Sequence, residues 1–217
     1  MVAQITEGTA FDEHGRPFRR RNYTPAIIVF ASLAVVTMLV WAFALNQPTA
    51  VHEATICNPP PAADPTQPAP SIGEQVKRAD MTEVSPAKLA DTRIRVLNAS
   101  GEGGQAAAIA GQLRDLGFAQ PEAANDPVYA SARLECQGQI RFGEAGRAAA
   151  AAVWLVAPCT ELYLDQRPDD TVDLAIGTEF AELSHSDDIE AVLASLRPDA
   201  TQPADSKLLS KIHSSAC

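Results

Sequence analysis

A glycine-rich stretch offers the most specific chemical motif in this 217-residue sequence. Residues 101–106, Gly-Glu-Gly-Gly-Gln-Ala, fit the spacing G-x-G-x-x-A, which in nucleotide-binding proteins places a pyrophosphate on a helix N-terminus. The surroundings of the motif do not fit, because no second apolar strand ends in an acidic residue about 20 positions later. We therefore expect a strand-to-helix turn in which glycine supplies positive φ angles, and we expect no cofactor.

A second group of reactive side chains lies at Ser184, His185, Asp187 and Asp188. These are the residue types of a catalytic triad, but neighbours in sequence rarely reach triad geometry. Serine and aspartate at the start of a predicted helix are explained by capping and by the helix dipole. The sequence also has no G-x-S-x-G motif, and its four histidines lack H-x-x-x-H spacing. We expect no catalytic residue and no metal site.

The four cysteines are Cys57, Cys136, Cys159 and Cys217. Cys136 precedes one predicted strand and Cys159 follows the next helix, so these two are expected to meet at one end of a sheet as a disulfide. By elimination, Cys57 then pairs with Cys217. Free thiols or intermolecular bonds are the alternative.

An uncharged stretch of 21 residues, Pro25 to Leu45, precedes all four cysteines. As a helix it would be roughly 31 Å long, enough to cross the hydrocarbon core of a bilayer. Its polar side chains are Ser32 and Thr37, which can hydrogen-bond back within a helix. A cleaved signal peptide is the competing interpretation, since Ala42-Phe43-Ala44 resembles a cleavage site, but the apolar run exceeds the usual signal core of 7–15 residues.

The charge distribution predicts the orientation of this segment. Residues 1–24 carry four arginines against three acidic residues, and the rest of the chain holds the large acidic excess of a protein with net charge −10. The positive-inside rule places the N-terminus in the cytoplasm and the remainder outside the cell, where disulfides form. The acidic remainder also argues against a nucleic-acid partner.

Composition divides the chain into five parts. A cytoplasmic tail is expected over residues 1–24, a single transmembrane helix over 25–45, and a proline-rich extracytoplasmic stalk over 46–90. Residues 72–90 within the stalk are compatible with a short helix packed on the domain edge. A folded domain is expected over residues 91–197, followed by a polar tail over 198–217.

The domain alternates strand and helix patterns. Predicted strands and helices follow one another in the order strand, helix, strand, strand, helix, strand, strand and helix. This order predicts an α/β two-layer sandwich with a mixed sheet and helices on one face. The main predicted elements are strands 93–98, 139–142, 161–165 and 171–176 and helices 105–116, 144–157 and 186–196.

Two motifs of this domain resemble the LytR C-terminal domain family. Residues 93–100, Arg-Ile-Arg-Val-Leu-Asn-Ala-Ser, with the following glycine turn, alanine-rich helix and Leu116-Gly117-Phe118, are similar to the first half of the family pattern. Residues 172–180, Val-Asp-Leu-Ala-Ile-Gly-Thr-Glu-Phe, are similar to its final strand. The resemblance covers residues 91–182.

This resemblance implies a non-catalytic extracytoplasmic domain that supports cell-envelope integrity, with a glycan, a lipid or an envelope protein as partner. Many members attach the domain to a polymer-transferring catalytic domain, for which this chain has no room. The alternative is an accessory enzyme or a regulator of wall-polymer attachment. Exposed amides of the glycine turn are the candidate site for a carboxylate or phosphate of such a partner. The candidate ligand-binding residues are Asn98, Ser100, Gly101, Gly103, Gly104 and Gln105.

Overall fold

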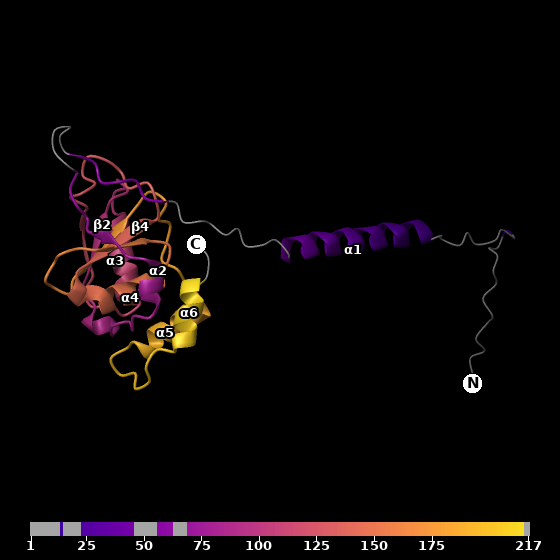
Figure 1. Cartoon of the computed structure of the whole chain (residues 1–217). Helices are drawn as coiled ribbons and strands as arrows, with labels where there is room; N and C mark the ends of the chain where they lie inside the picture. Colours follow the sequence, from indigo (N-terminus) through magenta and orange to yellow (C-terminus); the bar gives the residue numbers. More distant parts are fainter. Residues whose placement is uncertain (1–13, 15–22, 46–55, 63–68, 215–217) are drawn as a thin grey trace. The chain divides into compact units, whose positions relative to one another are not determined.

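The computed structural model describes residue 14 and residues 23–45, 56–62 and 69–214 (Figure 1). Contacts between Cα atoms divide the chain into two units near residue 50. The predicted cytoplasmic tail lies almost entirely outside the described residues, as does the first part of the predicted stalk.

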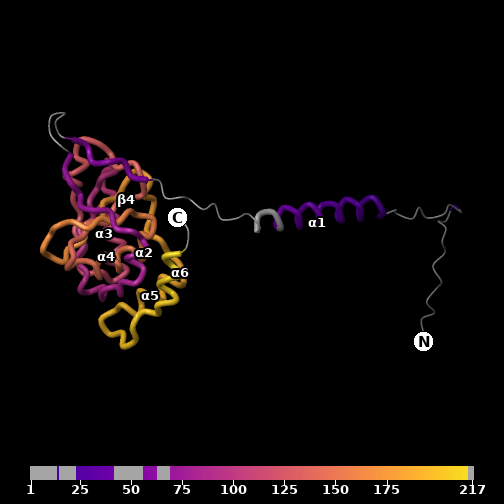
Figure 2. The backbone as a smooth tube through the Cα atoms, in the orientation of Figure 1, coloured from indigo at the N-terminus to yellow at the C-terminus, as the bar shows by residue number. Residues whose placement is uncertain are grey.

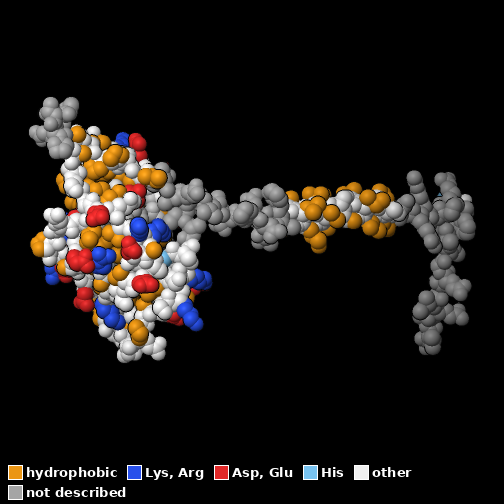
Figure 3. All heavy atoms as spheres, in the orientation of Figure 1, with side chains coloured by type: hydrophobic (Ala, Val, Ile, Leu, Met, Phe, Trp, Pro, Cys, Tyr) orange, Lys and Arg blue, Asp and Glu red, His pale blue; other side chains and the backbone are white. Residues whose placement is uncertain are grey.

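The first unit contains helix α1 (Thr24–Leu45). Its 22 residues correspond to a length of about 33 Å. The Ser32 hydroxyl donates to the Ile28 carbonyl oxygen at 2.6 Å, and Thr37 donates to that of Leu33 at 2.9 Å, so both polar side chains are satisfied within the helix as predicted. The described side chains form a mostly apolar surface (Figure 3). Within the described residues, α1 is the one helix long and apolar enough to cross a membrane.

The second unit is built on a six-stranded sheet in which two strand–helix–strand units flank a central strand, β6 (Val172–Ile176). Strand β6 runs parallel to β2 and antiparallel to β4. The sheet is therefore mixed, as the sequence predicts. The order of the strands is β1 (Glu74–Gln75), β5 (Glu161–Leu164), β4 (Gly138–Phe142), β6, β2 (Ile94–Asn98) and β3 (Glu122–Asn125).

Helices cover one face of this sheet. Helix α3 (Gln105–Asp115) connects the parallel strands β2 and β3, and α4 (Arg147–Val156) connects the parallel strands β4 and β5. Four consecutive buried alanines, residues 149–152, let α4 pack closely against its neighbours. Helices α5 (Asp187–Ser195) and α6 (Ser206–Ser214) lie side by side (Figure 2) and add Ile189, Val192 and Ile212 to the same core.

Strand alternation separates the apolar face from a polar face. In β4, Ile140 and Phe142 join the helix-side core, whereas Gln139 and Arg141 point to the other side. On that polar side Asp173 of β6 accepts two hydrogen bonds from Arg95 of β2, at 2.7 and 2.9 Å, and one from Arg167 at 2.7 Å. These cross-strand ion pairs satisfy the buried Asp173 carboxylate within the sheet.

The folded unit is larger than residues 91–197. Strand β1, helix α2 (Arg78–Thr82) and a 3₁₀ turn at Leu89–Asp91 belong to it, with Met81 and Leu89 fully buried, and α6 lies within the predicted polar tail. The short helix expected within residues 72–90 is confirmed as α2. The remaining elements were missed as part of the domain because each is short and contributes only one or two apolar anchors.

Helix α6 is held by an aromatic stack. The His213 ring lies parallel to the Trp154 ring of α4, with centroids 3.8 Å apart, and the Arg78 guanidinium lies 5.0 Å from the Trp154 centroid. Arg78 and the Trp154 indole both donate to the Pro158 carbonyl oxygen, at 2.7 and 3.1 Å. Burial, together with the neighbouring Arg78 charge, lowers the pKa of His213 to about 4.

We expect this stack to make the domain less stable in mild acid. The unfolded chain takes up a proton on His213 near pH 6.5 and the folded chain only near pH 4, so stability falls as the pH drops through that interval. The effect of this one residue is expected to be about 3 kcal/mol at pH 4. Urea unfolding of wild type and His213→Phe across pH 7 to 4 measures it. The variant keeps an aromatic ring against Trp154 and should lose this part of the pH dependence. Identical profiles of stability against pH in wild type and variant would contradict the assignment of the effect to His213.

Candidate functional site

A crevice of about 540 Å³ with a mixed polar and apolar lining lies at the carboxyl ends of β2 and β3, beside the N-terminus of α3. Ligands of α/β proteins commonly bind at this position, outside the carboxyl ends of parallel strands. One wall is the glycine turn after β2, and the other is the loop of residues 126–137, which leads from β3 to β4. The lining residues are Asn98, Ala99, Gly101, Gly103, Asn125, Asp126, Tyr129, Ala130, Ser131, Ala132 and Arg133.

The Asn98 side chain closes the glycine turn. Its Oδ1 accepts from the backbone N–H of Ser100 at 3.2 Å and of Gly101 at 3.3 Å, and its Nδ2 donates to the Glu102 carbonyl oxygen at 2.6 Å. The Glu102 N–H donates to the buried Ser100 hydroxyl oxygen at 3.0 Å. Gly101 and Gly104 adopt φ values of 81° and 82°, which confirms the predicted use of glycine for positive φ.

This arrangement divides the predicted ligand residues into two groups. Asn98, Gly101 and Gly103 line the crevice, whereas Ser100, Gly104 and Gln105 do not. The amides of Ser100, Gly101 and Glu102 are already bound by side chains of the turn itself, so they are not available to an anion. The turn acts mainly as a rigid wall.

A hydrogen-bond chain joins this wall to the end of β6. The Ser100 hydroxyl lies 2.6 Å from Gln105 Oε1, and Gln105 Nε2 donates to the Phe180 carbonyl oxygen at 2.9 Å. Gly177 follows β6 where an added Cβ would overlap the Cys136 carbonyl oxygen, so only glycine fits there. The turn after β2 and the stretch after β6 therefore depend on each other.

The opposite wall is fixed by a buried ion pair. Asp126 Oδ2 lies 3.0 Å from Arg141 Nη1, and both side chains are almost fully buried. Asp126 Oδ1 accepts from the backbone N–H of Val128 at 2.7 Å, which starts the loop toward Tyr129. Burial raises the pKa of Tyr129 above its ordinary value, so its hydroxyl stays protonated and can donate. This wall was not predicted, because residues 130–137 have no clear helix or strand pattern in the sequence.

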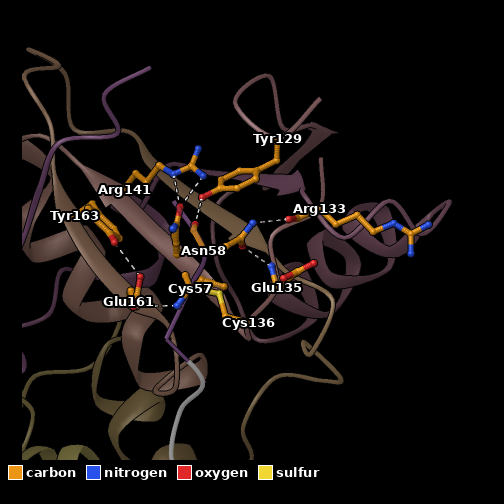
Figure 4. The surroundings of a disulfide bond; sticks show 11 residues. Cys57, Asn58, Tyr129, Arg133, Glu135, Cys136, Arg141, Glu161 and Tyr163 are labelled. Carbon is orange, nitrogen blue, oxygen red and sulfur yellow. Dashed lines mark hydrogen bonds between the residues drawn. A yellow bond between two sulfur atoms is a disulfide. The ribbon is translucent and has the colours of Figure 1, made fainter. Parts of the chain in front are cut away.

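A disulfide between Cys57 and Cys136 joins the segment around Cys57 to the loop that forms this wall (Figure 4). The next residue, Asn58, makes three further bonds to the loop. Its Nδ2 donates to the Arg133 carbonyl oxygen at 3.0 Å, its Oδ1 accepts from the Glu135 N–H at 2.7 Å, and its backbone carbonyl accepts from the Tyr129 hydroxyl at 2.7 Å. We call Cys57, Asn58 and these contacts the Cys57–Asn58 clamp.

The predicted disulfides Cys136–Cys159 and Cys57–Cys217 are therefore wrong. Cys136 and Cys159 do lie at the same end of the parallel strands β4 and β5, as predicted. However, Cys136 belongs to the small cluster on the sheet face away from the helices, and Cys57 packs there. Cys159, which follows α4, is disulfide-bonded, and Cys217 lies outside the described residues. The pairing was predicted wrongly because the residues around Cys57 have the composition of a linker, which suggested that Cys57 lies outside the folded domain.

The serine–histidine–aspartate group forms a helix cap. The Ser186 hydroxyl accepts from the Ile189 N–H at 3.2 Å and caps α5, as predicted. His185 Nε2 lies 3.0 Å from Glu190 Oε1, and Asp188 pairs with Lys211 of α6 at 2.5 Å. In the described part of the chain, no group of three His, Cys, Asp or Glu is placed to hold a metal ion.

The fold and its two linked motifs define a class of cell-envelope domains. The family model LytR cell envelope-related transcriptional attenuator matches residues 91–180, the range in which the sequence motifs lie. Together with the full-length similarity described next, this match shows that the chain belongs to the LytR C-terminal domain family.

Two relatives extend this comparison. The chain is 68% identical over 218 residues to the cell envelope integrity protein Cei of Mycobacterium tuberculosis (strain ATCC 25618 / H37Rv), with all of both chains covered. It is also 68% identical to the crystallised soluble domain of a conserved hypothetical secreted protein from Mycobacterium marinum. That comparison has a TM-score of 0.66 and covers 67% of this chain and 99% of the other.

Asn98→Ala tests the wall formed by the glycine turn. We expect a loss of about 2 kcal/mol in the free energy of unfolding, because the substitution leaves two backbone amides without their acceptor. Asn125→Ala is the matched control, since Asn125 lines the crevice but is exposed and its side chain makes no hydrogen bond to the described residues. Urea unfolding should show less than about 0.5 kcal/mol for the control. Equal losses in the two variants would contradict the role of Asn98.

The double variant Cys57→Ser/Cys136→Ser tests the disulfide. The bond joins residues separated by 79 positions, so the chain-entropy model gives a stabilisation of about 4 kcal/mol, which urea unfolding can measure. Peptide mapping of unreduced wild-type protein should recover Cys57 joined to Cys136. Recovery of Cys136 joined to Cys159 would contradict the structure.

Proposed function

We propose that α1 anchors this protein in the cell membrane as a single-pass helix, with the N-terminus in the cytoplasm and the domain outside the cell. There the non-catalytic domain maintains envelope integrity by binding a polar envelope component or an envelope protein in the crevice. The name of the full-length relative, a cell envelope integrity protein, supports this general role.

Two features support the orientation. The arginines at residues 16, 19, 20 and 21 lie within ten residues of the apolar helix on its N-terminal side, as the positive-inside rule requires for a cytoplasmic N-terminus. The Cys57–Cys136 disulfide supports an oxidising compartment for the domain. These two arguments are independent, because one concerns the N-terminal segment and the other the folded domain.

The set of side chains that line the crevice is the main support for the proposal of binding without catalysis. The polar part of its lining includes the exposed residues Asn125, Ser131 and Arg133. Within the described residues that line it, Ser131 has no histidine beside it, and the Asp126 carboxylate is occupied by Arg141. Such a set can donate and accept hydrogen bonds but lacks an activated nucleophile.

The experiment is a titration of the isotope-labelled outer domain, residues 51–217, with fractionated envelope glycans, lipids and proteins. We expect NMR shifts at Asn125, Ser131 and Arg133 with one class of ligand. Asn125→Ala should weaken that binding about five- to tenfold, the effect of one lost hydrogen bond, and leave the fold unchanged.

Two outcomes would contradict the proposal. Shifts confined to residues outside the crevice would place the binding site elsewhere. Turnover of a wall polymer or its precursor by the purified protein would instead favour the alternative, an accessory enzyme or regulator of wall-polymer attachment.

A further inference from the structure

Strand β3 forms an open edge of the six-stranded sheet. Within the described residues it pairs with β2 alone, and all four of its residues are exposed. The free N–H and C=O groups of such an edge can pair with another strand, and many proteins protect them with lysine, a bulge or a covering segment. The middle of β3 consists of Ala123 and Ala124 and carries no such protection.

The ladder between β2 and β3 shows which backbone groups face outward. The Asp126 N–H donates to the Asn98 carbonyl oxygen at 2.9 Å. Successive residues of a strand direct their backbone groups to opposite sides, so Ala124 also faces β2, whereas the N–H and C=O groups of Ala123 and Asn125 point away from the sheet. In the part of the chain that the structure describes, these outward groups have no hydrogen-bond partner.

Prolines bound this edge evenly on both sides. Pro121 and Pro127 each lie three residues from Ala124, and neither has an N–H to donate. Each also lies two residues from an outward-facing position, so a ladder formed on this edge ends at both of them. The edge therefore offers two complete donor–acceptor residues, Ala123 and Asn125, placed symmetrically about Ala124.

We propose that β3 pairs antiparallel with β3 of a second copy of this chain, with the two-fold axis at Ala124. In this register Ala123 of each copy faces Asn125 of the other. Each of these two pairs exchanges both N–H···O bonds, which gives four hydrogen bonds and uses every outward N–H of the strand. Moving one strand by two residues would instead require the carbonyl oxygen of Pro121 or Pro127, outside β3.

The symmetry of the edge is the reason for choosing a second copy as the partner. A two-fold interface needs a surface that is complementary to itself, whereas an unrelated extended peptide does not require even spacing about one residue. The two Ala124 side chains meet at the axis, where Cα atoms approach to about 4.5 Å and methyl groups fit. Glu122 lies opposite Asp126 of the second copy, and Arg141 compensates the Asp126 charge at 3.0 Å.

This pairing brings each crevice next to the other copy. Asn125 and Asp126 line the crevice, and Gln120 and Glu122 line a second hollow of about 450 Å³ at the other end of β3. Because the paired strands are antiparallel, the crevice of one copy lies beside the second hollow of the other. The pairing itself does not depend on what the crevice binds.

The test uses the full chain in detergent micelles and compares two added cysteines. Ala124→Cys places the new thiols opposite each other at a Cα separation that suits a disulfide, whereas Glu122→Cys places them more than about 13 Å apart. After mild oxidation, a non-reducing gel should show about tenfold more covalent dimer for Ala124→Cys than for Glu122→Cys. Peptide mapping should recover residue 124 joined to residue 124, and Cys57 still joined to Cys136.

A second pair of variants tests the backbone bonds. The Ala123 N–H faces away from β2, so Ala123→Pro removes no hydrogen bond within the domain but two of the four between copies. In the Ala124→Cys background, Ala123→Pro should lower the yield of covalent dimer about tenfold. Ala123→Ser keeps the N–H and is the matched control, which should leave the yield unchanged. Urea unfolding compares the stability of both variants with that of the parent.

Each result either supports or overturns the pairing. Equal cross-linking at residues 122 and 124, or no covalent dimer with either cysteine, would overturn it. A dimer yield that Ala123→Pro leaves unchanged would show that the copies do not join through the outward groups of β3. If Ala123→Pro lowers the stability of the domain, the comparison of the two cysteines decides the claim. None of these results bears on the proposed ligand of the crevice, which the NMR titration tests separately.

Discussion

The covalent bond between Cys57 and Cys136 is the constraint on which the candidate site depends. It brings a segment that precedes the sheet by some fifteen residues onto the sheet face away from the helices, where Asn58 bonds the backbone of the loop after β3. That face has few apolar residues, so packing alone gives this loop little stabilisation. A cross-link and a buried ion pair, Asp126–Arg141, supply what a larger core would otherwise provide.

The family motifs acquire a structural explanation from this arrangement. The asparagine of the first motif, Asn98, closes the turn after β2, and Gln105 passes the connection on to the carbonyl of Phe180 at the end of the second motif. Gly177 of the second motif allows the chain to pass against the carbonyl of Cys136. Both motifs therefore serve the two walls of one crevice, although they lie some 75 residues apart.

Much of the architecture could be predicted from the sequence, because strong local patterns determine it. Alternation in residues 93–98 and 171–176 and the alanine-rich run in α4 predict the mixed sheet and the helices on one face. The apolar run before Leu45 predicts α1 in the same way. The contributions of Leu89 and α6 were not predicted, because Leu89 is an isolated apolar residue and α6 is a short helix with three apolar side chains, Leu208, Leu209 and Ile212, in an otherwise polar tail.

The site could be predicted only in part. The glycine turn was found by its motif, but no sequence pattern indicates that the side chains of Asn98 and Ser100 bind the very amides that were expected to bind a ligand. The wall at Tyr129–Arg133 has no repeating pattern. The disulfide pairing was missed because spacing along the chain does not say on which face of a sheet a cysteine points.

Amide hydrogen exchange in Cys57→Ser/Cys136→Ser, compared with wild type, tests whether the disulfide builds the crevice wall. We expect faster exchange confined to residues 126–137, while the central strands β4, β6 and β2 keep their protection relative to one another. Unchanged exchange in this loop, or an increase of the same size throughout the sheet, would show that the clamp does not build the crevice wall.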